Sequence, residues 1–346
     1  MSDYPIVQDS ISVIIPTFNR AWLVSRAVRS AIAATRPGDE IIVVDDGSTD
    51  DTLVVLGTFG EQIRVIAAGH NGAGAARNLG IQEARHDWIA FLDSDDEWDA
   101  DKLELQRRLL AARPDVCFTF SDFRTVDRDG IKHPMFLRSW MADQRPWSDI
   151  LGPAKQYSEL APLTSDRPDF CVHIGDLYPA QLVSFCVATF TLVFRRSACQ
   201  PLPQFAEDVP TYEDHQFFGL LSRCGQGALL VSETATQHGH TSPRLTGTDE
   251  LRSSEARLRI TERVWGSDTV FLDGHANLYR DFVSDLRRRH QQLLVRKLAS
   301  EGNFVDARVE ASRAGRLPWK LALLLALPNP LARILLRLTR RRALGS

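Results

Sequence analysis

Short apolar runs alternate with helix-spaced segments along the first third of the chain. The runs are rich in β-branched residues and end in polar or turn-forming residues, which is typical of buried strands. The predicted strands lie at 12–18, 41–44, 62–68 and 87–92. The segments between them repeat apolar residues at the spacing of one helix face. The predicted helices lie at 20–34, 71–84 and 99–112, and a further helix is predicted to start within 49–52.

This alternation predicts an α/β fold in which a Rossmann-like, mostly parallel sheet is flanked by helices. Acidic residues follow two of the predicted strands: Asp45 and Asp46 follow one, and Asp93, Asp95 and Asp96 follow another. In parallel α/β sheets, ligands collect beyond the carboxyl ends of the strands. We therefore expect both acidic groups to face one crevice.

The pattern loosens beyond about residue 122. The segment 134–170 is rich in proline, aromatic and charged residues, and it predicts loops and short helices that shape a variable pocket, expected within 134–185. Strand character returns at 184–199. A helix is predicted at 210–225, with Thr211 as its N-cap. The segment 227–240 then predicts a strand that leads into a histidine-bearing loop.

Beyond residue 248 the pattern is helical. We therefore predict a first domain at 1–248, with halves at 1–121 and 122–248, and a helical C-terminal extension at 249–346. The tail at 317–346 contains Trp319 and many leucines but no acidic residue, and it ends in a basic stretch. Such a segment suits an anionic membrane surface. Packing on the first domain, or on the other chain of a homodimer, is the alternative.

Composition narrows the class of protein. Of 346 residues, 44% are hydrophobic and 25% are charged, as in soluble globular proteins, and the net charge of −3 gives no basic field for nucleic acid. The five cysteines form no CxxC pair and indicate reduced thiols rather than a zinc site. The N-terminus lacks a signal-like pattern, and no apolar run reaches the roughly 20 residues of a membrane span. We expect a cytoplasmic protein that is peripheral on the inner face of the membrane if its tail binds lipid.

The acidic residues after the predicted strand at 87–92 need a positive partner. Asp93 and Asp95 leave the strand two residues apart, and Mg²⁺ or Mn²⁺ binds carboxylate oxygens together with substrate phosphates. Capping of the following helix is the alternative for these acids, above all for Asp96 and Asp99.

Further polar groups occur at predicted loops and helix starts. Asp45 and Asp46 open the sequence DDGSTDDT, where turn chemistry competes with recognition of a nucleotide. The sequence NGAGAARNLG places glycines before a helix, a weak phosphate-binding signal. Glu213 and Asp214 begin a helix, where a carboxylate can act as a general base or complement the helix dipole. His238 and His240 follow a strand as candidate ligands or as structural residues.

In order, the sequences SVIIPTFNR, IIVVDDGSTDDT, NGAGAARNLG, WIAFLDSDDEW, YEDHQF and QHGHTS resemble the family 2 inverting glycosyltransferases of the GT-A fold. The resemblance covers about two-thirds of the chain, at residues 10–246. It implies a GT-A domain that binds a nucleotide-diphosphate sugar, with Mn²⁺ or Mg²⁺ at a DxD motif.

The resemblance also implies residue roles. Phe18 would stack on the base beside Pro16 and Thr17, Asp46 would bond the base, and Asp45 would support the ribose. Arg77 would lie near the nucleotide. Those residues belong to the nucleotide side of the crevice.

On the reacting side, Asp95 would bind the metal and Asp93 the metal or the ribose. Asp214 would be the catalytic base, with Glu213 as an acceptor-side or supporting residue. His238 matches a histidine of the loop over the diphosphate and is a candidate metal ligand. His240 competes for that role, because the usual tyrosine–arginine lead-in is absent from TATQH.

The expected function is metal-dependent, inverting transfer of a sugar, with a UDP-sugar as the expected donor. The acceptor would be a hydroxyl of a glycan or lipid-linked molecule in cell-surface polysaccharide biosynthesis. A sugar nucleotidyltransferase is one alternative, although such enzymes normally carry a basic glycine-rich loop where this chain has PTFNR. A non-catalytic glycan-binding protein is another, and the presence of Asp93, Asp95 and Asp214 argues against it.

Overall fold

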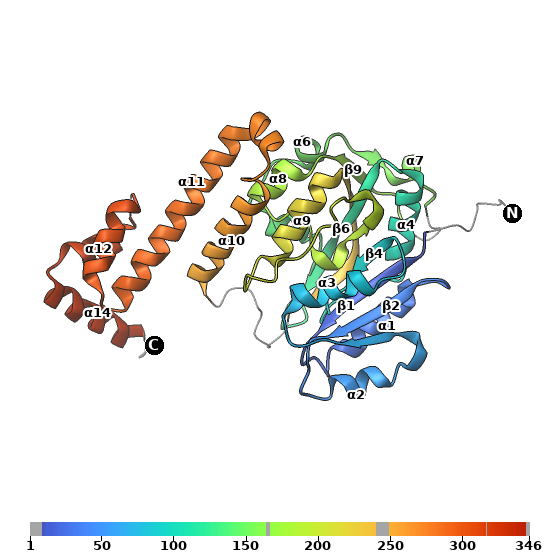
Figure 1. Cartoon of the computed structure of the whole chain (residues 1–346), viewed down its shortest axis with the longest axis horizontal. Helices are drawn as coiled ribbons and strands as arrows, with labels where there is room; N and C mark the ends of the chain where they lie inside the picture. Colours follow the sequence, from blue (N-terminus) through green and yellow to red (C-terminus); the bar gives the residue numbers. More distant parts are fainter. Residues whose placement is uncertain (1–8, 164–166, 240–248, 316, 344–346) are drawn as a thin grey trace. The chain divides into compact units, whose positions relative to one another are not determined.

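The computed structural model describes residues 9–163, 167–239, 249–315 and 317–343 (Figure 1). The chain divides into two compact units. The first comprises Met1–Val209 and Glu213–Pro243, and the second comprises Pro210–Tyr212 and Arg244–Ser346.

The first unit is built on one mixed sheet, which has eleven strands in the described part of the chain. One half is parallel throughout, in the order β3, β2, β1, β4. These strands are β1 Ile11–Thr17, β2 Glu40–Asp45, β3 Arg64–Ala67 and β4 Trp88–Phe91. Three of the four are apolar and buried along most of their length, as expected for strands covered on both faces.

The other half of the sheet contains antiparallel pairs, beginning with β10 against β4 and continuing through β6, β11, β9 and β8. Only β6 and β11 run parallel to each other in this half. Two short strands join its side, with β5 on β11 and β7 on β6. The strands are β5 Glu97–Trp98, β6 Val116–Val126, β7 Lys132–His133, β8 Lys155–Gln156, β9 Cys171–Gly175, β10 Val193–Arg195 and β11 Gln226–His238.

Helices flank this sheet (Figure 1). They are α1 Val24–Ala34, α2 Thr52–Gly57, α3 Ala73–Glu83, α4 Lys102–Ala112, α5 Leu137–Trp140, α6 Trp147–Leu151, α7 Tyr157–Leu160, α8 Tyr178–Val183 and α9 Glu213–Cys224. Single 3₁₀ turns lie at Gly60–Gln62, Thr189–Thr191 and Arg196–Ala198. Helix α3 packs so closely on β1 that a Cβ added at Gly80 would lie only 2.4 Å from a methyl carbon of Ile14.

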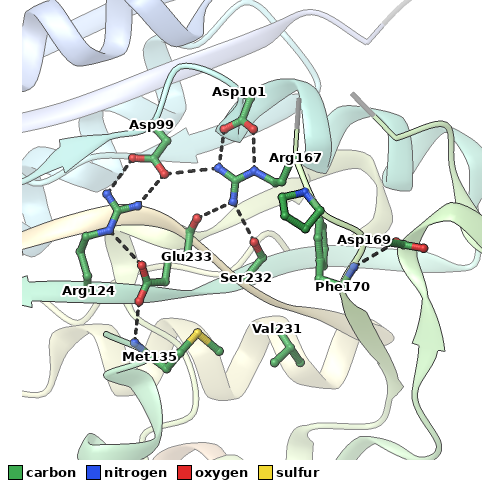
Figure 2. A pocket seen from close by; sticks show the side chains of 11 residues that line it. Asp99, Asp101, Arg124, Met135, Arg167, Asp169, Phe170, Val231, Ser232 and Glu233 are labelled. Atoms are coloured by element: carbon green, nitrogen blue, oxygen red, sulfur yellow. Dashed lines mark hydrogen bonds and ion pairs between the residues drawn. The ribbon is translucent and has the colours of Figure 1, made fainter. Parts of the chain in front are cut away.

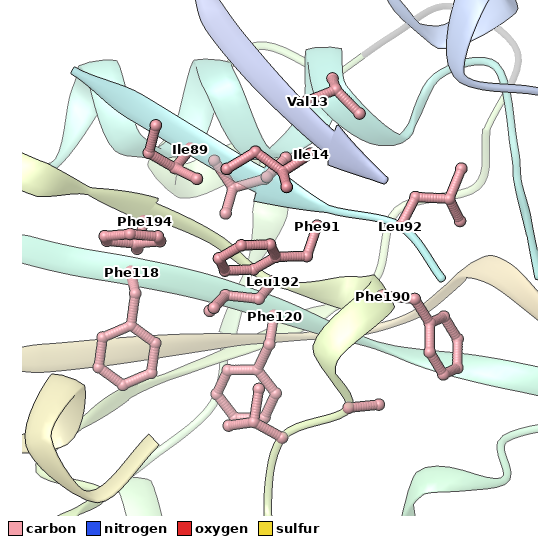
Figure 3. Packing of buried hydrophobic residues seen from close by; sticks show 14 of the residues in the cluster. Val13, Ile14, Ile89, Phe91, Leu92, Phe118, Phe120, Phe190, Leu192 and Phe194 are labelled. Carbon is pink, nitrogen blue, oxygen red and sulfur yellow. The ribbon is translucent and has the colours of Figure 1, made fainter. Parts of the chain in front are cut away.

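The core lies along the middle of the sheet (Figure 3). Phe91 of β4 is fully buried, and the rings of Phe194, Phe205 and Phe217 surround it at centroid distances of 5.3–6.0 Å. Burying a phenylalanine side chain contributes about 1.5–3 kcal/mol. Since Phe217 belongs to α9 and Phe91 to β4, this cluster fixes the start of α9 relative to the end of β4.

The second unit is helical. Its helices are α10 Glu250–Val264, α11 Thr269–Ser300, α12 Phe304–Arg313, α13 Trp319–Ala326 and α14 Asn329–Ala343. The side chains of Asp249, Asp268 and Asn303 cap the first three. The end of α11 and helices α12–α14 share a small apolar core around Val295, Phe304 and Leu325. None of the helices described is long and apolar enough to cross a membrane.

The structure confirms the expected α/β architecture with a helical C-terminal region, and it shows the sheet to be mixed. Strand character was predicted for the segment 184–199, but only Val193–Arg195 pairs as a strand, and the rest is loop and 3₁₀ turn. Thr211 does not cap α9, because the helix begins at Glu213 and the Thr211 hydroxyl bonds Ser253. His238 is the last residue of a strand rather than part of a loop.

Candidate active site

The parallel strands bring the two acidic groups to one edge of the sheet. Strand β1 lies between β2 and β4, with Thr17 opposite Asp45 and with the Leu92 amide bonded to the Ile14 carbonyl. The carboxyl ends of all three strands therefore point the same way. Asp45 and Asp46 leave the sheet on one side of β1, and Asp93 leaves it on the other.

Asp45 and Asp46 face different partners. The Asp45 carboxylate accepts hydrogen bonds from the amide and the hydroxyl of Ser48, at 3.0 and 2.5 Å, so it closes the turn after β2. The Asp46 carboxylate accepts from the amides of Asn71 and Gly72, both at 2.8 Å. Asp46 thus ties the end of β2 to the glycine-bearing loop that begins α3.

The end of β1 completes this side of the crevice. Pro16 and Thr17 are buried, and the hydroxyl of Thr17 is among the buried polar atoms that have no hydrogen-bond partner in the described structure. Phe18 follows with 37% of its surface exposed, and its ring contacts that of His70 with centroids 4.3 Å apart. An exposed aromatic ring thus lies next to the Asp46 loop.

Arg77 connects the loop after β4 with the start of α9. Its buried guanidinium donates to Asp93 at 2.7 Å and to Glu213 at 3.4 Å, and it lies over the ring of Phe205. Burial opposes its charge, but Asp93, Glu213 and Asp214 together raise the pKa of Arg77 above its ordinary value. One cation from α3 therefore holds the end of β4 next to the start of α9.

Asp214 is a partly buried acid beside this bridge. Burial, followed by the charge of Glu213, raises the pKa of Asp214 to about 7, and Arg77 opposes the rise. A carboxyl group with such a pKa is a competent proton acceptor near neutral pH, because general bases work best when their pKa lies near the working pH.

The loop after β4 concentrates negative charge. Asp96 is buried, and burial, followed by the charges of Asp95 and Asp93, raises its pKa well above the usual range. Arg26 reaches this loop, but it donates to the Asp95 carbonyl, at 2.7 Å. Three carboxyl groups thus lie within one short loop, and the charges of Asp93 and Asp95 act on Asp96.

This donor set fits a divalent cation that arrives with phosphate. In the described ranges, no three His, Cys, Asp or Glu side chains converge closely enough to hold a metal ion by themselves. Mg²⁺ and similar ions, however, are usually held by one or two carboxylates plus substrate phosphates. Asp93 and Asp95 offer such a pair of oxygens.

His238 lies against the same acidic loop but faces other partners. Its amide donates to the Asp96 carboxylate at 3.2 Å, and its Nε2 lies 3.2 Å from a carboxylate oxygen of Glu97. It therefore joins the end of β11 to the loop after β4. His240, the other histidine considered, lies outside the described residues.

A cavity of about 620 Å³ lies elsewhere in the first unit (Figure 2). Arg124 and Arg167 line it, and both bond the Asp99 carboxylate, at 2.6 and 3.3 Å. Arg167 also bonds Asp101, which precedes α4. Neither Arg77 nor Asp214 lines this cavity. Its ion pairs hold Asp99 and Asp101, and they therefore anchor the segment between the acidic loop and α4.

Sequence reasoning missed the bridging role of Arg77, the contact of Arg26 and the cavity network. Arg77 and Glu213 are 136 residues apart, and the sequence carries no local signal of their contact. Arg124 lies in β6, a strand that the sequence pattern did not reveal.

Comparison with known proteins gives the family context. A sequence model described as "Glycosyl transferase family 2" matches residues 12–198. TuaG of Bacillus subtilis (strain 168), named as a teichuronic acid biosynthesis glycosyltransferase, is 35% identical over 133 residues, which are 37% of this chain and 52% of TuaG.

WfgD of Escherichia coli is named as a UDP-Glc:alpha-D-GlcNAc-diphosphoundecaprenol beta-1,3-glucosyltransferase. It is 31% identical over 123 residues, 35% of this chain and 48% of WfgD. The matches thus span about half the length of these two relatives. The crystal structure of S. aureus TarS 1-349 in complex with UDP-GlcNAc has a TM-score of 0.53 at 16% identity, and the match covers 87% of this chain and 88% of that one. This likeness shows the fold.

The opposing charges around Asp214 predict opposite effects of two substitutions. Glu213→Gln removes the negative neighbour and should lower the pKa of Asp214, whereas Arg77→Met removes the positive neighbour and should raise it, each by roughly one pH unit. A ¹³C NMR titration of the Asp214 carboxyl in metal-free protein measures both changes. Arg77→Lys keeps the charge and is the control. Shifts of the same sign in the first two variants would contradict this account.

Proposed function

The chain belongs to glycosyl transferase family 2. On that premise we propose that it is a glycosyltransferase that moves a sugar from a nucleoside-diphosphate sugar to a hydroxyl group. We propose a UDP-sugar as the donor, in keeping with the UDP-Glc in the name of WfgD and the UDP-GlcNAc bound by TarS. We propose a glycan or lipid-linked acceptor in cell-surface polysaccharide synthesis, in keeping with the names of TuaG and WfgD.

The observation that carries this proposal is the bridge from Asp93 through Arg77 to Glu213. It brings the acidic loop, suited to a cation and its diphosphate, next to Asp214, a carboxyl group with a pKa of about 7. Donor activation and proton removal need these two kinds of group on either side of one bound sugar.

In the proposed reaction, Asp214 takes the proton of the acceptor hydroxyl. The hydroxyl oxygen attacks the anomeric carbon from the side opposite the diphosphate. A new carbon–oxygen bond forms, the bond from the anomeric carbon to the diphosphate oxygen breaks, and the configuration inverts. Mn²⁺ or Mg²⁺ held by Asp93 and Asp95, when bound, supplies positive charge for the leaving diphosphate.

The nucleotide is proposed to lie on the other side of β1. Phe18 offers an exposed ring for the base, and Pro16 and Thr17 form the wall beneath it. Asp46 contributes a carboxylate already held by two amides, and Asp45 shapes the adjoining turn. Arg77 contributes by holding Asp93 in place.

We propose a membrane surface as the partner of the tail. Trp319 and Leu323 of α13 are one helical turn apart with exposures of 71% and 54%, and Leu331, Ile334 and Leu335 form a similar exposed row on α14. The sequence from 317 to 346 has basic residues and no acidic one. Apolar contact with lipid and attraction to anionic headgroups would then act together, on the inner face of the cell membrane.

Substitution of the proposed base gives a direct prediction. Asp214→Asn should lower sugar transfer by about 10²–10⁴-fold, the usual contribution of a general base, while binding of UDP is retained. Release of UDP from donor sugars with an acceptor present measures transfer, and calorimetry measures binding. Asp129→Asn, at an exposed turn, is the matched control. Transfer at a near wild-type rate in Asp214→Asn would rule out this base, and release of pyrophosphate by the wild type would indicate a nucleotidyltransferase.

The acidic loop gives a second prediction. Asp95→Ala should weaken the binding of Mn²⁺ together with UDP by about tenfold or more, because one of the two proposed carboxylate ligands is lost. Calorimetric titration of UDP with and without Mn²⁺ measures the change. Asp129→Ala should leave both titrations unaltered. Equal Mn²⁺ dependence in Asp95→Ala and in the wild type would remove Asp95 from the site.

A third prediction concerns the tail. The double variant Trp319→Ser, Leu323→Ser should float with anionic vesicles much less than the wild-type chain does, because it loses the most exposed apolar row of α13. The matched control is Val305→Ser, Val309→Ser, which alters an apolar pair on α12 with exposures of 61% and 50%. Equal flotation of the wild type and the α13 variant would argue against lipid as the partner of α13. Equal flotation of the wild type with neutral and anionic vesicles would argue against a role of the anionic headgroups.

A further inference from the structure

We propose that His70 contacts the nucleobase of the donor and contributes to the choice of base. None of the roles assigned so far uses this residue. The inference rests on the proposed function, because it concerns the nucleotide side of that site. It follows from the position of the His70 ring, its hydrogen bond and the conformation of its backbone.

The His70 ring lies against an exposed aromatic surface. It contacts Phe18 with ring centroids 4.3 Å apart and an angle of 33° between the planes, and 63% of its own side chain is exposed. Phe18 comes from the end of β1, and His70 from the loop between β3 and α3. Two aromatic rings from separate elements thus form one platform with a face open to solvent. Nucleobases stack on such surfaces, a contact worth about 1–3 kcal/mol per base.

The hydrogen bond of His70 orients its other nitrogen. Nδ1 lies 3.1 Å from the backbone carbonyl of Asp46, and a carbonyl oxygen can only accept, so Nδ1 carries the hydrogen. In the neutral ring, Nε2 is then an acceptor. An acceptor beside a stacking surface complements a base that presents a ring N–H, as uracil and guanine do.

The backbone of His70 is held in an uncommon conformation. Its φ of 57° lies in the left-handed region, which few residues other than glycine adopt. The turn after β2 packs against His70, since a Cβ at Gly47 would lie 3.2 Å from the His70 Cβ. The amide of the next residue, Asn71, bonds the Asp46 carboxylate. Conformations of this kind often occur at functional sites, and here the contacts on both sides fix the ring beside Phe18.

The test compares ligands that have and lack a base. His70→Gly removes the ring and accepts the φ of 57° without strain, and His70→Asn tolerates the same backbone while offering no aromatic face. In calorimetric titrations with Mn²⁺, His70→Gly should bind UDP about tenfold more weakly than the wild type does. His70→Asn should bind UDP with a similar loss. Binding of inorganic pyrophosphate, which has no base, should be the same in all three proteins.

A matched control and distinct outcomes separate this inference from the proposed function. His133→Ala changes an exposed histidine of β7 and should bind UDP as the wild type does. Wild-type protein that binds no nucleoside diphosphate would overturn the proposed function itself. Wild-type binding of UDP with equal binding by His70→Gly would overturn only the role of His70. An equal loss for UDP and pyrophosphate in His70→Gly would also overturn it, because the residue would then act on the phosphates or on the fold.

Discussion

The buried ion pairs of Arg77 are the constraint on which the candidate site depends. A buried guanidinium without partners is costly, and removing one partner of a buried pair typically costs about 3–5 kcal/mol. Arg77 takes its partners from two elements, Asp93 after β4 and Glu213 at the start of α9. Moving α9 away from the sheet would therefore remove one of the two acidic partners of Arg77 and separate Glu213 from the cation. The geometry of the site is in this way part of the stability of the fold.

Arg77 carries one positive charge, whereas several acidic side chains lie around it. Asp93, Asp95 and Asp96 crowd one loop, and Glu213 and Asp214 open the neighbouring helix. Burial, followed by the charges of the neighbouring acids, raises the pKa values of Asp96 and Asp214. A protein that gained nothing from such crowding would be more stable with fewer acids. The arrangement is understandable if the chain binds something positive there and uses one acid as a base.

The fold could be predicted from the sequence where burial of the strands alone determined the pattern of apolar residues. In the first third, three of the four predicted strands are buried along most of their length, so the apolar runs stand out and the alternation with helices is clear. The prediction was wrong where apolar residues are buried without being extended. Phe190 is buried in a 3₁₀ turn, yet it resembles a strand residue in the sequence. Strand β6 was missed although it is central, because its start follows a helix closely and its end carries charges.

The candidate site was predictable in its residue types but not in its contacts. Asp45 and Asp46 are adjacent and chemically identical, and only the folded chain shows that one closes a turn while the other holds the glycine-bearing loop. His70 gave no signal at all, because a lone histidine in a loop has no periodicity. Its significance comes from Phe18, which is 52 positions earlier in the numbered sequence.

These contacts also give the crevice a direction. Neighbouring strands lie about 4.8 Å apart, so the ends of β2 and β4, with β1 between them, are separated by about 10 Å. The β2 side offers aromatic rings and hydrogen-bond acceptors, and the β4 side offers a concentration of carboxylates. A molecule that is planar and apolar at one end and bears a metal-bound diphosphate at the other matches both sides in only one orientation. In the proposed binding mode, that orientation would direct the end beyond the diphosphate, which carries the sugar, toward Asp214, the proposed base.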